Sequence, residues 1–402
     1  MKLGRRELLK ASAAAMLGSL MSKDLSAQPG KRSGLVTLFV CGDVMTGRGI
    51  DQVLPHPSDP RLYEGYVKNA LTYVELAEKR NGAIAQPVGF SYVWGDALEA
   101  LGTADVRIIN LETSVTKSGK PLPKGINYRM NPENIPCITV AGIDCCVLAN
   151  NHIFDWGDRG FFETLETLRS AGLKTAGVGR DDKEATRPAV CDVEGKGRVL
   201  VIGLGSTSSG IPESWAASID KPGVNLLLDD SGDVSRITRQ VKAVRRPRDI
   251  VVASIHWGSN WGYRIPRIHR ELAHGLIDDA GVDVVHGHSS HHVKGIEIYH
   301  RKLILYGCGD FINDYEGIRG HEKYRGDLAL MYLVSMSPVS RELRRVEMIP
   351  LQMRRFQLKR ATKRDARWLR DVLVREGRAL GTTAELGEDD RLTLHSVRQI
   401  EQ

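Results

Sequence analysis

The sequence predicts an α/β fold, and three observations lead to this expectation. Short runs rich in β-branched residues alternate with segments of helical spacing from about residue 36 onward, which is typical of a sheet connected by helices. Several runs end in a polar side chain, among them Asp43, Glu112 and His256, at the positions where α/β sheets collect their ligands. With 402 residues, 42% of them hydrophobic, the chain can bury a large core, which excludes a disordered or collagen-like protein.

The individual elements follow from local patterns taken in chain order. Continuous apolar runs predict buried strands at residues 35–41, 106–110, 145–149, 198–204, 250–255, 282–286 and 302–306. Apolar residues three or four positions apart predict helices at residues 132–141, 160–171, 235–244 and 267–279. Residues 328–351 have the pattern of two more strands, and residues 363–381 that of a charged surface helix. We therefore expect one main domain over residues 28–351 and a C-terminal helical extension over residues 352–402.

The first 27 residues have the features of an export signal. Arg5 and Arg6 precede an apolar, Ala-rich stretch at 11–21, and the small residues that end at Ala27 suit a cleavage site. The stretch is shorter than the about 20 residues that span a bilayer. We therefore expect a twin-arginine signal peptide over residues 1–27, and a protein that is exported to the periplasm or another extracytoplasmic space.

The net charge, the cysteine spacing and one glycine-rich segment argue against several further classes of protein and site. The formal net charge is +7, but residues 1–27 carry five basic against two acidic residues, so the remainder is too mildly basic to predict a nucleic-acid partner. The six cysteines lack paired spacings, which favours buried free thiols over disulfides or a zinc site. The Gly- and Ser-rich segment 203–212 lacks the Gly-Lys-Ser/Thr signature of a phosphate-binding loop, so we expect it to line the cleft or to form a turn.

The polar residues at the strand ends suit metal-assisted hydrolysis. Hydrolysis of an ester or amide at neutral pH needs an activated water and a stabilised negative charge, and one or two divalent metals supply both. Carboxylate, amide and imidazole groups are suitable ligands for such ions. The strand-end groups of these types are, in chain order, Asp43, Glu112, Asn150, Asn151, His152, His256, His286 and His288.

Five motifs carry a family resemblance. They are Gly-Asp-Val-Met-Thr-Gly-Arg at 42–48, Asn-Leu-Glu at 110–112, Leu-Ala-Asn-Asn-His at 148–152 with Asp-Trp-Gly at 155–157, His-Trp-Gly at 256–258, and Gly-His-Ser-Ser-His at 287–291. In this order they resemble the CapA-like poly-γ-glutamate (capsule) synthesis family, which is similar to the calcineurin-like metallophosphatases. The resemblance covers about residues 36–315. It implies a four-layer αββα sandwich, metallophosphatase-like, with a C-terminal strand and helix extension and a metal site where the strand-end loops meet.

The resemblance also implies roles for single residues. His152 would be the general acid, and Asp155 would either orient it or cap the following helix. Arg48 and Arg129 are either anion clamps for the substrate or surface arginines. The implied ligands of one or two divalent metal ions, with Mn, Fe, Co and Zn as candidates, are Asp43, Glu112, Asn151, His256, His288 and His291.

The sequence departs from the superfamily pattern at three points. Met45 stands where a histidine ligand is expected, and its thioether is a poor ligand for hard divalent ions. The closing histidine pair is spaced by three residues instead of two, which leaves His286 and His292 as alternative ligands. Asp310 is an additional carboxylate that either orients a ligand histidine or forms a turn.

Three functions remain open on these grounds. The first is an exported metal-dependent hydrolase or transferase that acts on an anionic polymer, with poly-γ-glutamate or capsule as the implied substrate class. The second is a non-catalytic scaffold subunit of a membrane complex for capsule or polyglutamate synthesis and export, which the substitution at Met45 favours. The third is a metal-dependent phosphodiesterase that acts on a phosphorylated substrate. Metal content separates the first two functions.

Overall fold

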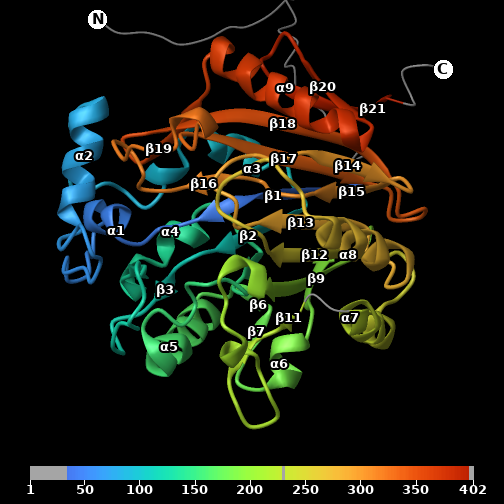
Figure 1. Cartoon of the computed structure of the whole chain (residues 1–402), viewed down its shortest axis with the longest axis horizontal. Coiled ribbons are helices and arrows are strands. Elements are labelled where there is room, and N and C mark those ends of the chain that lie inside the picture. The colour runs from blue at the N-terminus through green and yellow to red at the C-terminus, as the bar shows by residue number, and fades with distance from the viewer. Residues whose placement is uncertain (1–33, 229–230, 398–402) are drawn as a thin grey trace, which may run out of the picture. The chain divides into compact units, whose positions relative to one another are not determined.

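The computed structural model describes residues 34–228 and 231–397, and the expected signal peptide lies outside these ranges. Two large β-sheets form the centre of the described fold (Figure 1). The first sheet contains, in spatial order, β20 (Thr382–Leu386), β21 (Leu392–Ser396), β18 (Leu343–Arg354), β17 (Leu328–Met336), β1 (Val36–Val44), β2 (Val106–Leu111), β5 (Cys145–Val147) and β6 (Lys174–Ala176). Two short strands join it, since β16 (Asp310–Ile312) pairs with β1 and β19 (Gln357–Arg360) with β18.

The second sheet contains the strands that end in His256 and His288. Its order is β11 (Leu226–Leu227), β9 (Gly197–Ser206), β12 (Ile250–His256), β13 (Val284–His288), β15 (Lys302–Leu305) and β14 (Ile296–Tyr299), and β8 (Ala189–Val193) pairs with β9. Strands β9, β12, β13 and β15 are parallel to one another, as are β1, β2, β5 and β6 in the first sheet. The carboxyl ends of neighbouring strands therefore lie along one edge of each sheet.

The second sheet is buried on both faces, so successive residues of its strands pack into two different cores. In β12, Ile250 and Val252 belong to the large core shared with the first sheet, whereas Val251, Ala253 and Ile255 belong to a second core. That second core is closed by α7 (Ser231–Val244) and α8 (Arg267–Asp278), which lie on the outer side of the sheet (Figure 1). Successive residues of a strand point to opposite faces, so a continuous apolar run is what a doubly covered strand requires.

Helices also cover the first sheet, which completes the expected order of helix, sheet, sheet and helix. Apolar side chains of α3 (Leu98–Leu101), α4 (Pro136–Thr139), α5 (Gly157–Ser170) and α9 (Lys363–Gly377) belong to its core. The remaining α-helices of the described ranges are α1 (Gly49–Val53), α2 (Leu71–Asn81) and α6 (Asp182–Thr186). The predicted α/β class and the two packed sheets flanked by helices are thus confirmed. No helix in the described ranges is long and apolar enough to cross a membrane.

Two predictions about elements need correction. The helix expected at 132–141 is split into a 3-10 turn, Pro132–Asn134, and the short α4, because Pro136 has no amide hydrogen with which to continue a preceding helix. The boundary expected at residue 351 falls inside β18, and β19, β20 and β21 continue the first sheet. The C-terminal segment is therefore a strand and helix addition to the same sheet, and not a helical extension.

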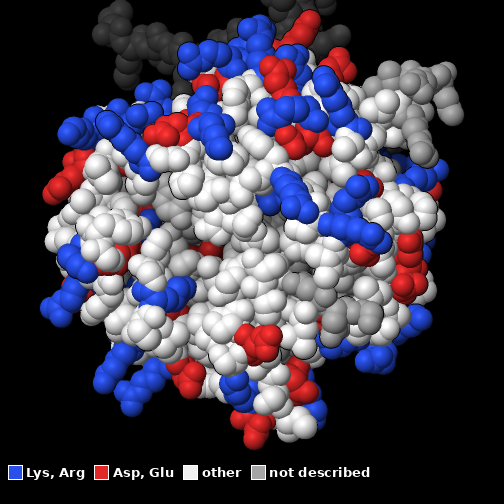
Figure 2. Space-filling model, viewed as in Figure 1, with Lys and Arg blue, Asp and Glu red and all other residues white. Residues whose placement is uncertain are grey.

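The register of the strands brings the polar ends together. Asp43 is the Cα partner of Asn110 in β2 and of Asp310 in β16, while His256 is opposite His288. A side chain at Gly42 would lie 1.6 Å from the carbonyl oxygen of Gly309, so only glycine permits this close approach of the two strands. On the face drawn in Figure 2, Lys and Arg side chains are interspersed with Asp and Glu.

Candidate metal centre

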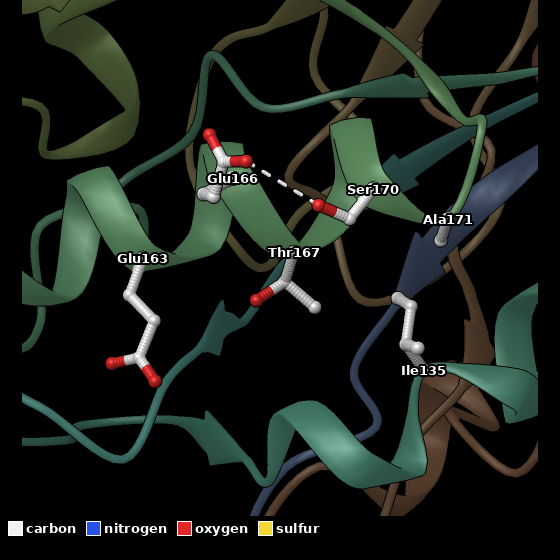
Figure 3. Close-up of a pocket in the computed structure, with 6 residues that line it drawn as sticks. All are labelled: Ile135, Glu163, Glu166, Thr167, Ser170 and Ala171. Carbon is white, nitrogen blue, oxygen red and sulfur yellow. Dashed lines mark hydrogen bonds between the residues drawn. The ribbon is translucent and has the colours of Figure 1, made fainter.

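A cavity of about 260 Å³ opens where the strand ends of the two sheets meet. It contains most of the residues predicted to form a site, and Asp43 and His288 lie fully buried behind its wall. The residues that line it are Glu112, Lys124, Gly125, Ile126, Tyr128, Asn151, His152, His256, Asn260, Ser289, His291 and Tyr315. A second hollow, of about 370 Å³, lies beside α5 (Figure 3), and none of the predicted site residues lines it.

Asp43 is the carboxylate shared by both sheets. Its Oδ1 accepts a hydrogen bond of 2.7 Å from the Asn110 side chain, and its Oδ2 accepts one of 3.1 Å from the Ser289 amide. Burial, together with the nearby Asp310 carboxylate, raises the pKa of Asp43 to about 7. Burial likewise raises the pKa of Glu112 well above its ordinary value. A cation in the cavity would favour the ionised form of both groups.

A chain of hydrogen bonds fixes which nitrogen of His288 faces the cavity. His286 Nε2 lies 2.6 Å from the Cys41 carbonyl oxygen, which only accepts, so Nε2 carries the proton. Burial lowers the pKa of His286 to about 4, so its Nδ1 has a lone pair that accepts from the Ser254 hydroxyl at 3.0 Å. Ser254 Oγ then accepts from Nε2 of His288, also at 3.0 Å. The Nδ1 atom of His288 is left with a lone pair, 3.0 Å from His256 Nδ1. His286 is thus occupied within the core and is not a ligand.

The geometry and chemistry of this cluster fit a divalent metal ion. Ligand atoms of Asp43, His256 and His288 all lie within 4.8 Å of one another, and the three residues are buried. In the same cavity wall, the side-chain oxygen of Asn151 is buried and has no hydrogen-bond partner among the described residues. An unpaired buried carbonyl oxygen is costly unless something outside the chain binds it. A carboxylate, an amide oxygen and two imidazoles form a donor set that such ions accept.

The opposite side of the cavity is organised differently. His291 Nδ1 donates to Asp310 Oδ1 at 2.8 Å, and its Nε2 accepts from the Asn260 amide at 2.9 Å. Although burial opposes protonation, the Asp310 carboxylate raises the pKa of His291. Of the two roles considered for Asp310, the geometry supports the orientation of His291. The Met45 sulfur, which is 1% exposed, accepts only the Tyr315 hydroxyl at 3.5 Å.

His152 and Asp155 form a hydrogen-bonded pair beside the cluster. The Nδ1 atom of His152 donates to Asp155 Oδ2 at 2.7 Å, and the same oxygen accepts from the Tyr128 amide at 2.6 Å. Lys124 donates to Asp155 Oδ1 at 2.7 Å. The His152 Nε2 atom faces Glu112, 3.7 Å from its Oε1. Burial lowers the pKa of His152 to about 4, so the imidazole is neutral at pH 7 and has to accept a proton before it can donate one.

The expectation that Arg48 binds substrate has to be corrected. Its guanidinium is 1% exposed and forms ion pairs with Glu64, at 2.9 Å, and with Asp314. Arg129 does not line the cavity either, because it stacks on Trp156 with its guanidinium carbon 3.9 Å from the ring centre. In the described lining the cationic side chain is that of Lys124, which the sequence analysis did not single out.

His292, the other alternative ligand, is also occupied. Its Nε2 accepts from the Gly262 amide at 3.0 Å, and its Nδ1 lies 3.0 Å from the Val293 carbonyl oxygen. The structure therefore brings two groups of candidate ligands together, Asp43 with His256 and His288, and Asp43 with His291 and Asp310. Asn151 and Glu112 line the same cavity.

The family is decided by the match of most of the chain to one family model. Residues 37–315 match the model described as bacterial capsule synthesis protein PGA_cap. The chain belongs to this family. Its strands from β17 onward lie beyond the matched residues, so the C-terminal addition to the first sheet is a feature outside the family model.

Two relatives by sequence agree with this assignment. A probable polyglutamine synthesis accessory protein of Mycobacterium tuberculosis is 47% identical over 363 residues, which cover 89% of this chain and 95% of the relative. The capsule biosynthesis protein CapA of Bacillus anthracis is 27% identical over 69% of this chain and 60% of its own length. A solved structure of a Mycoplasma pneumoniae phosphatase aligns with a TM-score of 0.43 and 11% identity, over 79% of this chain and 94% of that one.

Proposed function

We propose that this protein is an exported, metal-dependent hydrolase or transferase that acts on poly-γ-glutamate or a related anionic capsule polymer. One observation supports catalysis above the others: Asp43, His256 and His288 direct their donor atoms to one point, and the His152–Asp155 pair faces the same cavity. The names of the relatives, which refer to capsule, PGA and polyglutamine synthesis, support the class of substrate.

The proposed centre holds one ion, with Asp43, Asn151, His256 and His288 as its ligands. Mn, Fe, Co and Zn are the candidates, because the donors are oxygen and imidazole atoms. A divalent metal supplies, when bound, a lowered pKa for a water molecule and compensation for negative charge on the reacting group. A second ion, for which Asp43, His291 and Asp310 would be the ligands, is expected to bind more weakly, because Met45 offers no suitable ligand atom.

The remaining residues of the cavity bind substrate and move protons. The Lys124 ammonium, at the cavity wall, attracts a carboxylate of the polymer. The unprotonated Nε2 of His152 accepts a proton from the attacking nucleophile and donates it to the leaving nitrogen or oxygen. Asp155 keeps the imidazole in the orientation and tautomer that leave Nε2 free, and it stabilises the imidazolium while the proton is held.

A scaffold function is the second candidate, and two observations favour it. Met45 removes a ligand position that the superfamily pattern contains. The Mycobacterium tuberculosis relatives are named accessory proteins, which is the description of a partner in synthesis and not of the synthase. In that case the protein would act in a membrane complex for polymer synthesis, with little turnover of its own.

A direct assay tests the proposed catalysis. The purified protein is stripped with a chelator and reloaded with Mn, Fe, Co or Zn, and glutamate release from poly-γ-glutamate is compared with hydrolysis of bis(4-nitrophenyl) phosphate. We expect one bound equivalent of metal and release of γ-linked glutamate, reduced by about 10²–10⁴ in His152→Ala with metal retained. Hydrolysis of the phosphodiester alone would favour the phosphodiesterase, and absence of both metal and turnover would favour the scaffold.

Export has its own test. Replacing Arg5 and Arg6 by lysine removes the paired arginines of the proposed signal while keeping its charge. We expect the variant to accumulate in the cytoplasm, measured by cell fractionation. Recovery of the variant outside the cytoplasm at the level of the unchanged protein would reject the twin-arginine route.

A further inference from the structure

Lys294, in the loop between β13 and β14, is a buried cation without a counterion. The residue is 4% exposed, and no described residue forms a hydrogen bond or an ion pair with its ammonium group. Burial lowers the pKa of Lys294 to about 8, so the charged form still prevails at pH 7. The Nζ atom keeps a small contact with solvent, but the side chain is largely removed from water without an opposite charge beside it, which disfavours the charged form. This position therefore calls for an anion from outside the chain.

A second polar group points to the same place. Gly258, two residues after β12, has a φ of 77° and no side chain. A Cβ atom built there would lie 3.1 Å from His269 Cε1, 3.7 Å from His269 Nδ1 and 4.0 Å from Lys294 Nζ. Lys294 Nζ and His269 Nδ1 therefore both lie within 4.0 Å of one position beside Gly258.

His269 is held so that its Nδ1 atom remains available. Its ring stacks on Trp257, with ring centres 4.7 Å apart and planes within 3°. Its Nε2 lies 3.3 Å from Ser208 Oγ, and no described residue bonds to Nδ1. When the Ser208 hydroxyl donates to Nε2, Nδ1 carries the proton and is a second donor beside the Lys294 ammonium, which cannot accept it.

The charge of this place is positive and uncompensated. Burial, together with the positive charge of Lys294, lowers the pKa of His269 to about 4. No Asp or Glu in the described ranges forms an ion pair or hydrogen bond with either side chain. A neutral imidazole N–H and an ammonium are both donors, so they match the oxygens of an anion better than a cation or an apolar group.

We propose that Lys294 and His269 form an oxyanion site beside Gly258, which takes one carboxylate or phosphate group. This site is distinct from the metal centre, and it does not depend on the proposed catalysis, because all its donors are present in the metal-free chain. It adjoins the centre through Ser289, whose hydroxyl donates to the Gly258 carbonyl at 3.2 Å and whose amide donates to Asp43. A polymer with a carboxylate on each unit is one source of such a group, and free phosphate is another.

Calorimetric titration of the chelator-treated protein tests this site, with inorganic phosphate and a short γ-glutamyl oligomer as separate probes. We expect one bound equivalent, and affinity at least about tenfold weaker in Lys294→Met. Lys183→Met, which removes an exposed lysine from α6, serves as the control and should bind phosphate like the unchanged protein.

The possible results distinguish the two sources of the anion and show when the proposed site has to be rejected. Binding of both probes, lost in Lys294→Met, supports a general oxyanion site, and binding of the oligomer alone supports the polymer as its source. Phosphate binding that survives in Lys294→Met, or that is lost in Lys183→Met, rejects the site and indicates an adventitious ion only. Because Lys294→Met removes an uncompensated charge, we expect its melting temperature without phosphate to equal or exceed that of the unchanged protein. A marked decrease would assign Lys294 a structural role and overturn the proposal.

His269→Phe, which keeps the stack on Trp257 and removes the Nδ1 donor, should weaken phosphate binding severalfold.

Discussion

The two sides of the cavity contain similar residue types in different states. On one side, ligand atoms of Asp43, His256 and His288 lie within 4.8 Å of one another, and Nδ1 of His256 lies 3.0 Å from Nδ1 of His288. On the other side, His291 is held at both nitrogens by Asp310 and Asn260. In the first arrangement two imidazole nitrogens contact each other and a cation could bind both, whereas in the second each nitrogen already contacts a carboxylate or an amide. The comparison teaches that a motif histidine is identified as a ligand by what its two nitrogens already bind.

The largest expected difference between the two sides is in metal affinity. His256→Ala removes a ligand atom. We therefore expect metal affinity to fall by more than about 100-fold, which is the largest loss typical for removal of a residue that only orients a ligand. His291→Ala should lower affinity less than about tenfold. Titration of the chelator-stripped protein with Zn or Mn measures both. Equal losses in the two variants would show that both sides bind metal.

The hydrogen-bond chain behind His288 offers a smaller and more specific change. Ser254→Ala leaves the Nε2 proton of His288 without its acceptor, so the lone pair at Nδ1 is no longer fixed. We expect metal affinity to fall by about 10- to 100-fold, as for other groups that orient a ligand histidine. Ser254→Thr keeps the hydroxyl and should restore most of the affinity. Unchanged affinity in Ser254→Ala would mean that the chain does not control the tautomer.

The buried carboxylate predicts how metal binding depends on pH. With the pKa of Asp43 raised to about 7, the metal has to displace a proton below pH 7. Apparent affinity should therefore rise about tenfold per pH unit between about pH 5.5 and 7, and level off above. Burial lowers the pKa of both His256 and His288, so these histidines contribute little to the slope in this range. Competition with a chelating dye at several pH values measures the slope, and a flat profile would contradict the protonated state of Asp43.

The smallest change is the addition of a ligand on the side that lacks one. Met45→His restores the residue that the superfamily pattern has at this position, close to Asp43 in the chain. We expect the bound metal, measured by elemental analysis, to increase from one equivalent toward two. Met45→Leu, which keeps the apolar volume, should remain at one. A single equivalent in Met45→His would show that His291 is too firmly held to join a second site.

The sequence allowed the strand ends to be predicted, because an apolar run followed by Asp, Asn or His is a local pattern. The sequence also contained a signal that we did not use, namely polar residues inside two buried strands. Ser254 and His286 each precede a site histidine by two residues in the same strand, and the period of two places them on the same face. A polar side chain inside a buried strand needs a hydrogen-bond partner. Here Ser254 bonds to His286 and also to His288.

Other features depend on contacts that no local pattern contains. Arg48 lies in a family-like motif, but its partner Asp314 is 266 residues away in the chain, so its burial as an ion pair was not predictable. Lys124 comes from an irregular loop and not from a strand end, and only the fold brings it to Asp155. The short strands β20 and β21 carry exposed and polar residues, so their apolar pattern was too weak to identify them as part of the first sheet.

All six cysteines are buried and unpaired, which makes the redox fate of the protein depend on when it folds. Burial raises the pKa of every one of these thiols above its ordinary value, so the reactive thiolate is scarce in the folded chain. An unfolded chain, in contrast, would expose six thiols to any disulfide-forming oxidant, with many possible wrong pairings. A chain that folds in a reducing compartment is therefore protected before it meets oxidants, whereas one that folds afterwards risks covalent misfolding.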